Sequence, residues 1–178
     1  TRATPWLFNA TATAHLGPRL AAYAGYTRGM EESGIAPQIA SNRNEALPAI
    51  LTNQRDAGFR YRFGDRLSLV AGVFDVRKPY FTLDADDLYR QLGEVRSRGI
   101  EASLSGAVSE HVDVVLGAVL LRPRVHGPDV EAGIVGRRPV GLASRQLDLN
   151  ADWRIAAVDG LSFDAGVSHV GTVPATPD

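Results

Sequence analysis

The chain of 178 residues contains no cysteine, which excludes disulfide bridges, thiolate metal sites and cysteine nucleophiles. It also lacks an apolar run near the roughly twenty residues that a membrane-spanning helix requires. The longest such run, residues 112–121, is interrupted by Asp113. Neither sign of charge predominates, because the formal net charge is only -1. Without a global basic field, we expect no nucleic-acid partner.

Sequence motifs of catalysis and metal binding are equally scarce. The chain has no G-x-S-x-G elbow, P-loop or G-x-G-x-x-G stretch, and its four histidines lie far apart. The acidic stretch LDADDLY at residues 83–89 is similar to a calcium loop. It lacks the glycine and the closing glutamate of an EF-hand, so we interpret it as a solvated loop. We therefore predict no enzymatic activity, no metal site and no cofactor.

What the sequence does have is alternation. In RQLDLNADWRI, residues 145–155, apolar side chains such as Leu147, Leu149 and Trp153 alternate with polar ones. A period of two predicts an extended strand with one apolar and one polar face. In a soluble sandwich the apolar face would contact a protein core. In an outer-membrane barrel it would contact lipid, and the polar face would line an aqueous lumen.

The same pattern, with turn residues between its segments, predicts about eight strands and almost no helix. The pair Gly64-Asp65 is a hairpin-turn signal between two of these strands. One short helical turn is expected within residues 84–92. The predicted strands are residues 7–16, 20–28, 53–63, 66–77, 94–106, 112–124, 145–155 and 161–170.

The connections between these strands are alternately short and long. The long ones are residues 29–52, 78–93 and 123–144, and structureless loops of this length are uncommon in compact domains unless they are functional. Outer-membrane barrels have short periplasmic turns and long extracellular loops. The alternation therefore favours an all-β, antiparallel up-and-down meander that forms part of a transmembrane β-barrel. We expect residues 1–178 to be a single segment of it.

Individual strands support both environments. Phe59, Tyr61 and Phe63 share one face of a strand that ends at a short turn, where a barrel would have an aromatic girdle. They would serve equally well in the core of a sandwich. The strand VDVVLGAVLL is apolar on both faces in its second half, which favours the sandwich because a lumen face should be polar.

Two longer stretches resemble TonB-dependent siderophore receptors. LAAYAGYTRGMEESGIAPQIASNRNEALPAILTNQRDAGFRY resembles their YASYS-G strand, long extracellular loop and KQ-E-G strand, with Asn53 in place of Lys and Asp56 in place of Glu. VRSRGIEASLSG, residues 95–106, resembles their V-S-GIE-E-SG strand. The similarity spans about residues 20–125, and the flanking hairpins continue it.

This resemblance implies a place in the bacterial outer membrane, contact with its lipid, and uptake of ferric siderophores or related iron chelates. The TonB complex would power transport through a plug domain. Because the 178 residues contain no plug domain, TonB box or terminal aromatic strand, we expect an internal or truncated portion of a receptor. Two alternatives remain open: a soluble all-β binding module, and a small eight-stranded structural barrel of the outer membrane.

A receptor for chelated iron needs no metal ligands of its own. It needs a pocket with aromatic planes, and guanidinium groups that pair with the oxygens of anionic chelates. The predicted long loops contain side chains of these kinds. The candidate ligand-binding residues are Tyr80, Phe81, Tyr89, Arg90, His126, Arg137 and Arg138.

Overall fold

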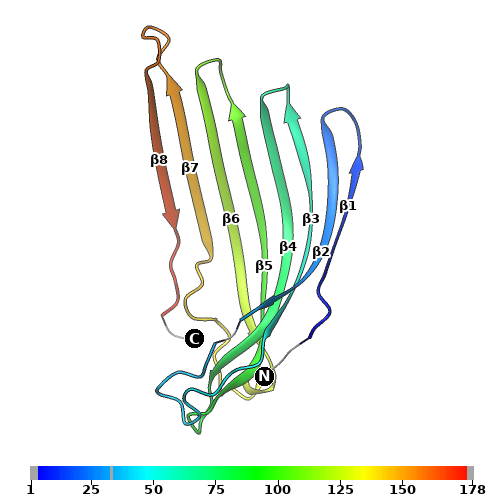
Figure 1. The fold of residues 1–178 in the computed structure, drawn as a ribbon, viewed down its shortest axis with the longest axis vertical. Helices are drawn as coiled ribbons and strands as arrows, with labels where there is room; N and C mark the ends of the chain where they lie inside the picture. The colour runs from blue at the N-terminus through cyan, green and yellow to red at the C-terminus, as the bar shows by residue number, and fades with distance from the viewer. Residues whose placement is uncertain (1–3, 33, 176–178) are drawn as a thin grey trace.

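The computed structural model describes residues 4–32 and 34–175 of the chain. Eight antiparallel strands form one sheet in the order β1-β2-β3-β4-β5-β6-β7-β8, so every strand pairs with its neighbour in sequence. The predicted all-β meander is confirmed (Figure 1). Its elements are β1 (Phe8–His15), β2 (Leu20–Glu31), β3 (Ile50–Phe63), β4 (Leu67–Leu83), β5 (Tyr89–Ala107), β6 (Val112–His126), α1 (Pro128–Glu131), β7 (Arg145–Arg154) and β8 (Ser162–Val170).

The connections are sorted between the two ends of the sheet. Residues 16–19, 64–66, 108–111 and 155–161 join strands at one end, which we call the turn end. Residues 32–49, 84–88 and 127–144 join strands at the other, the loop end. Gly64 begins its turn at φ 66°, a conformation that glycine adopts without steric cost.

The predicted loop 78–93 is wrong. β4 continues to Leu83 and β5 starts at Tyr89, so a long hairpin replaces most of the loop and residues 84–92 form no helical turn. A register shift between Tyr80 and Phe81 marks a bulge in this hairpin. The extra residue is Leu92 of β5, because Tyr80 pairs with Gly93 and Phe81 with Gln91. It interrupts the alternation of faces along β5, so a period-two pattern starts that strand too late, at residue 94.

The one helix in the described chain, α1, was not predicted. It has four residues, with Pro128 in its first turn, and is too short to produce a helical period. No described helix is long and apolar enough to cross a membrane. Downstream of α1 the chain returns along β6, where the Val125 amide donates to the Arg137 carbonyl at 2.9 Å and the Leu121 amide to the Ser144 carbonyl at 2.8 Å.

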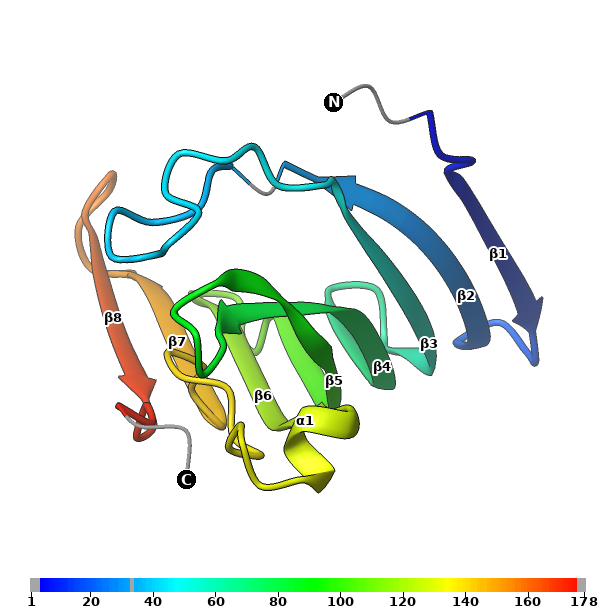
Figure 2. The same ribbon diagram turned by 90° about the horizontal axis from the view of Figure 1, so that it is seen from below.

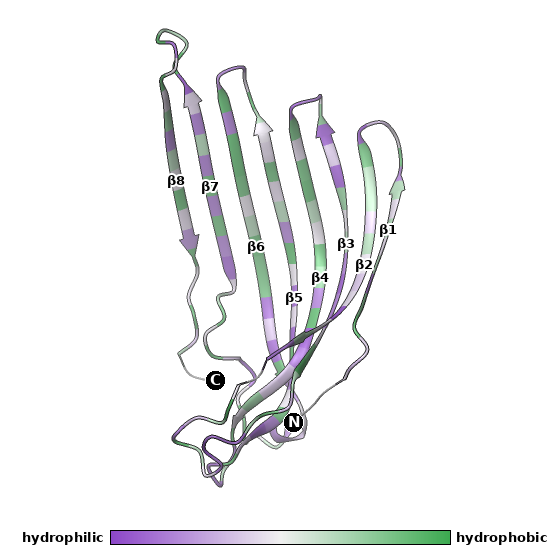
Figure 3. Ribbon diagram, viewed as in Figure 1, coloured by the Kyte–Doolittle hydropathy of each residue, from purple (hydrophilic) through white to green (hydrophobic). Residues whose placement is uncertain are grey.

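The strand register separates two faces of the sheet. On the face that we call apolar, Leu69, Leu104, Leu116, Leu149 and Val167 form one cross-strand row. The next row belongs to the opposite, polar face and contains Val70, Ser103, Gly117, Asp148 and Ser168. The alternation of hydropathy along the strands is visible in Figure 3.

Aromatic side chains gather at the turn end of the apolar face. Tyr61 packs edge-on against Phe63 with ring centroids 4.8 Å apart, and Trp153 lies 6.5 Å from Phe163. The exposed fractions are 48% for Phe63 and 54% for Trp153. Large aromatic rings at the edge of an apolar face match the arrangement of an aromatic girdle.

On the polar face, Tyr23 lies across two glycines of the neighbouring strands. A Cβ atom built on Gly58 or on Gly72 would come within 2.7 Å of the Tyr23 hydroxyl oxygen. A larger residue at either position would displace the ring, so these glycines are required by close packing.

The sheet is one curved layer, as Figure 2 shows. Within the described residues the apolar face has no second layer over it, and Val167 is 68% exposed. The buried cluster lies instead at the loop end, where Val130 and Val135 pack with Leu92, Val95 and Val125. A closed two-layer sandwich, in which the apolar face would be covered, is therefore not the observed architecture.

Candidate ligand-binding end

The tip of the β4–β5 hairpin contains three of the candidate residues. The rings of Phe81 and Tyr89 stack with centroids 6.4 Å apart, and Arg90 Nε donates to Asp84 Oδ2 at 2.6 Å. The other oxygen of Asp84 accepts the amide of Leu88 at 2.9 Å, which closes the turn. The hydrogen bond from Arg90, followed by that from the Leu88 amide, lowers the pKa of Asp84. The tip is thus a fixed aromatic and charged structure.

The connection 32–49 is attached to this tip. Asn42 Nδ2 donates to the Tyr89 carbonyl at 3.1 Å, and Asn42 Oδ1 accepts the Tyr89 amide at 2.9 Å. The Ser41 amide also donates to the Asp87 carbonyl at 2.8 Å. Figure 1 shows the connection and the tip together at the loop end. Sequence reasoning missed Asn42, because its partner is more than forty residues away and no local motif marks the contact.

Tyr80 belongs to a different environment. It precedes the bulge and packs against the buried cluster of Leu92, Val95 and Val125, to which α1 adds Val130. Tyr80 is therefore a partly buried supporting residue of the hairpin. Its predicted place in a solvated loop is wrong, because β4 includes it. Phe81, Tyr89 and Arg90 likewise lie on strands β4 and β5 and not in a loop.

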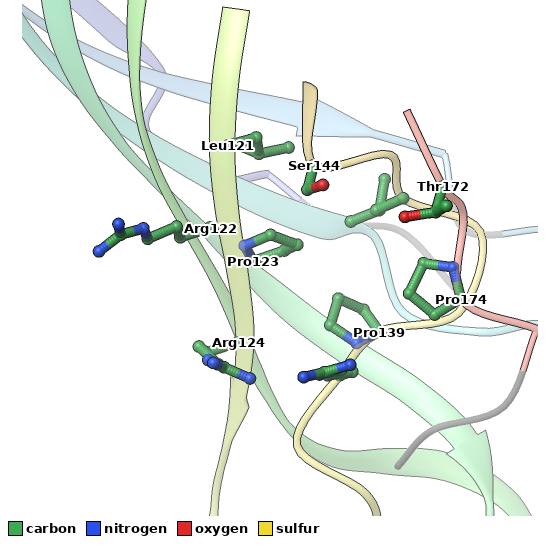
Figure 4. A pocket seen from close by; sticks show the side chains of 10 residues that line it. Leu121, Arg122, Pro123, Arg124, Pro139, Ser144, Thr172 and Pro174 are labelled. Atoms are coloured by element: carbon green, nitrogen blue, oxygen red, sulfur yellow. The ribbon is translucent and has the colours of Figure 1, made fainter. Parts of the chain in front are cut away.

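The remaining candidates lie near the end of β6. His126 is the last residue of β6, and Arg137 holds Val125 through its backbone. Arg138 lines a concavity of about 260 Å³ between β6, the segment 138–144 and the chain after β8. Figure 4 shows Pro123, Pro139 and Pro174 around this space. Its ten lining residues include none from the β4–β5 tip.

The candidate residues therefore lie in two groups of side chains and not in one pocket. At the tip, Phe81 and Tyr89 stack on one face of the hairpin, and Arg90, which pairs with Thr82, lies on the other. The second group is the concavity beside Arg138. Among the described residues no group of three or more His, Asp or Glu side chains could hold a metal ion. Stacked rings and guanidinium groups suit binding of a planar or anionic molecule.

Comparison with known proteins places this geometry in a family. The model of the TonB dependent receptor-like β-barrel matches residues 2–178. The chain is a member of this family, so the resemblance seen in the sequence is confirmed. Among curated proteins, the ferrichrome receptor FcuA of Yersinia enterocolitica is 26% identical over 159 residues, which cover 88% of this chain.

Solved structures show the same fold. The ferric preacinetobactin receptor BauA of Acinetobacter baumannii is 25% identical, with a TM-score of 0.69 over 92% of this chain. The ferric-catecholate import receptor Fiu of Escherichia coli K12 is 21% identical, with a TM-score of 0.71 over 97% of this chain. This chain spans 19% of the length of FcuA and 25% of the length of each of these two structures.

Proposed function

We propose that this chain is part of the barrel wall of an outer-membrane receptor that takes up ferric siderophores or related iron chelates. The observation that carries the proposal is the uncovered apolar face, which forms a regular band across the sheet. The opposite face is polar on β3, β5 and β7, although β6 also places Val115 and Val119 there. In a barrel wall this band faces lipid and the polar face lines the lumen. The family membership of the chain and the names of its relatives support this reading.

The loop end would face outside the cell, and the proposed ligand-binding residues lie there. Phe81, Tyr89 and Arg90 lie at the tip. Arg138 lines the concavity, and His126 and Arg137 lie at the end of β6. Tyr80 supports the first group from beneath. Transport would use the TonB complex acting through a plug domain, with no catalytic step. Of these partners, only the chelate would contact the loop end directly.

The membrane orientation is tested with a fluorophore on a single cysteine, since the chain has no other cysteine. In the protein purified from the outer membrane and placed in vesicles, a label at Leu149 should be quenched by a lipid-borne quencher and shielded from an aqueous one. The reverse should hold at Asn150, its neighbour on the polar face. If neither quencher reaches position 149, that side chain is packed in protein and the proposed orientation is wrong.

Ligand uptake is tested in cells that depend on the protein for iron. Growth on ferrichrome and on a ferric catecholate should require both this protein and TonB. Substituting Tyr89→Ala together with Arg90→Ala should weaken binding of the transported chelate. A matched pair at the turn end, Tyr61→Ala with Arg62→Ala, should leave binding unchanged. Equal loss from both pairs would show a general effect on the barrel and would remove the support for a site at the tip.

A further inference from the structure

Toward the loop end, arginines replace the apolar side chains on the apolar face. Two residues beyond Ala57, Ile100 and Leu120, on the same face, stand Arg55, Arg98 and Arg122. The register also places Arg77 opposite Arg96 and Arg96 opposite Arg124. These side chains form a continuous band across four strands, which we call the arginine belt. Its members are Arg55, Arg77, Arg96, Arg98, Arg122 and Arg124.

The belt has more positive charge than its own carboxylates balance. Asp75 accepts hydrogen bonds from Arg96 and, at 3.2 Å, from Arg98, and it lies 3.4 Å from Arg77. Glu94 is the other carboxylate that the register places on this face within the belt. Several arginines therefore surround one central aspartate, in a chain whose overall net charge is -1.

Three members of the belt remain available to another molecule. In the described chain no ion pair involves Arg55, Arg122 or Arg124. Arg55 lies over the Tyr26 ring at 5.7 Å. Arg122 and Arg124 also line the concavity beside Arg138, although Figure 4 shows Arg122 extending from β6 away from Pro139 and Pro174. Arg98, although paired with Asp75, keeps 59% of its side chain exposed.

The height of the belt fits the boundary of a membrane. From Leu67 at the turn end to Asp75 in the belt, β4 rises by about 26 Å at roughly 3.3 Å per residue. With the usual strand tilt this is about 20 Å along the membrane normal, close to the roughly 25 Å apolar band of outer-membrane barrels. The belt would thus lie where hydrocarbon gives way to lipid headgroups.

We propose that the arginine belt binds the phosphate groups of lipid headgroups in the outer leaflet. Guanidinium groups form bidentate, charge-assisted hydrogen bonds with phosphate. Such anions would relieve the mutual repulsion of the arginines, and the apolar band below would hold the acyl chains of the same lipid. This inference rests on the proposed function, because it requires the apolar face to be in the membrane.

The experiment measures binding of lipid A to the protein purified from the outer membrane and freed of lipid in detergent. The probes are bisphosphorylated lipid A and the same lipid after enzymatic dephosphorylation. The unmodified protein should prefer the phosphorylated form, and the preference should fall as salt is raised. Substituting Arg122→Gln with Arg124→Gln should weaken binding of the phosphorylated form about 30-fold. This is the loss expected when two arginines near an anionic surface are removed.

The control is Arg60→Gln with Arg62→Gln, an equal change of charge on the polar face. It should leave lipid binding unchanged. Equal binding of the two lipid forms by the unmodified protein would overturn the proposal, whether or not the belt variant folds. A label at position 149 distinguishes failure of this proposal from failure of the proposed function. Quenching there by the lipid-borne quencher, without any preference for phosphorylated lipid, would contradict lipid binding by the arginine belt but would still support the membrane orientation. Binding of a ferric siderophore by the arginine belt, without binding of lipid, would also overturn the proposal.

Discussion

The two ends of the same strands are held together in different ways. At the loop end, Leu92, Val95 and Val125 are at most 4% exposed and pack under α1, as in a small soluble core. At the turn end, Phe63 and Trp153 are about half exposed, because within the described residues nothing covers the apolar face. The loop end supplies its own apolar surroundings. In the proposed orientation the turn end obtains them from lipid.

The largest effect is expected in the core of the loop end. Leu92→Ala removes a side chain that is 2% exposed, and such substitutions reduce the free energy of unfolding by about 2–5 kcal/mol. Leu88→Ala, at the partly exposed tip, should cost much less. Denaturant titration of both variants in detergent, monitored by circular dichroism, measures the difference in the free energy of unfolding. Equal costs would mean that the loop end has no core of its own.

The turn half should instead respond to charge in a way that depends on lipid. Leu149→Arg places a guanidinium in the apolar band and should cost about 2–4 kcal/mol near the bilayer midplane. Asn150→Arg, on the polar face, should be nearly neutral. Folding measurements in vesicles check both variants. A neutral result for Leu149→Arg in vesicles would place that side chain away from hydrocarbon.

A smaller effect is expected where connection 32–49 meets the hairpin tip. Asn42→Ala removes both hydrogen bonds to the Tyr89 backbone, each of which contributes about 1 kcal/mol. Amide hydrogen exchange at Tyr89 should become faster. Gln38→Ala, which removes only an exposed contact with Asn44, is the control. Unchanged exchange in the Asn42 variant would show that the tip is ordered without the connection.

The smallest effect concerns pH at the tip. The folded-state pKa of Asp84 is lowered, so its contribution to the order of the tip is complete above the ordinary aspartate pKa and is lost as the pH falls through the lowered value. Exchange of the Leu88 amide, measured over that acidic range, should therefore accelerate. Asp84→Asn should abolish this pH dependence, whereas Asp86→Asn should retain it. A pH dependence that survives in Asp84→Asn would assign the change to another group.

The sequence predicts the turn half better than the loop half for a physical reason. Alternation in residues such as 53–63 and 145–155 is imposed by two different environments on the two faces, and it can be read without the structure. Toward the loop end the extra residue Leu92 interrupts that period in β5, and α1 is too short to have one. The start of β5 at Tyr89 and the small core were therefore missed.

The candidate site was predictable only in part. Aromatic and basic side chains identified the tip, but the contact of Asn42 with Tyr89 joins distant segments that no local pattern connects. The arginine belt shows a related difficulty. Arg96 and Arg98 are two residues apart on one strand, as are Arg122 and Arg124 on the next, but only the register between strands brings the two pairs together.

The two edges of the sheet have a consequence for insertion. In the described chain β1 and β8 each pair with one neighbour only, so each presents a row of backbone N–H and C=O groups. Hydrocarbon offers these groups no hydrogen-bond partner, and each unpaired group costs several kcal/mol there. The sheet therefore cannot enter a bilayer while the edges of β1 and β8 are unpaired. Other strands must pair with both edges as the sheet inserts.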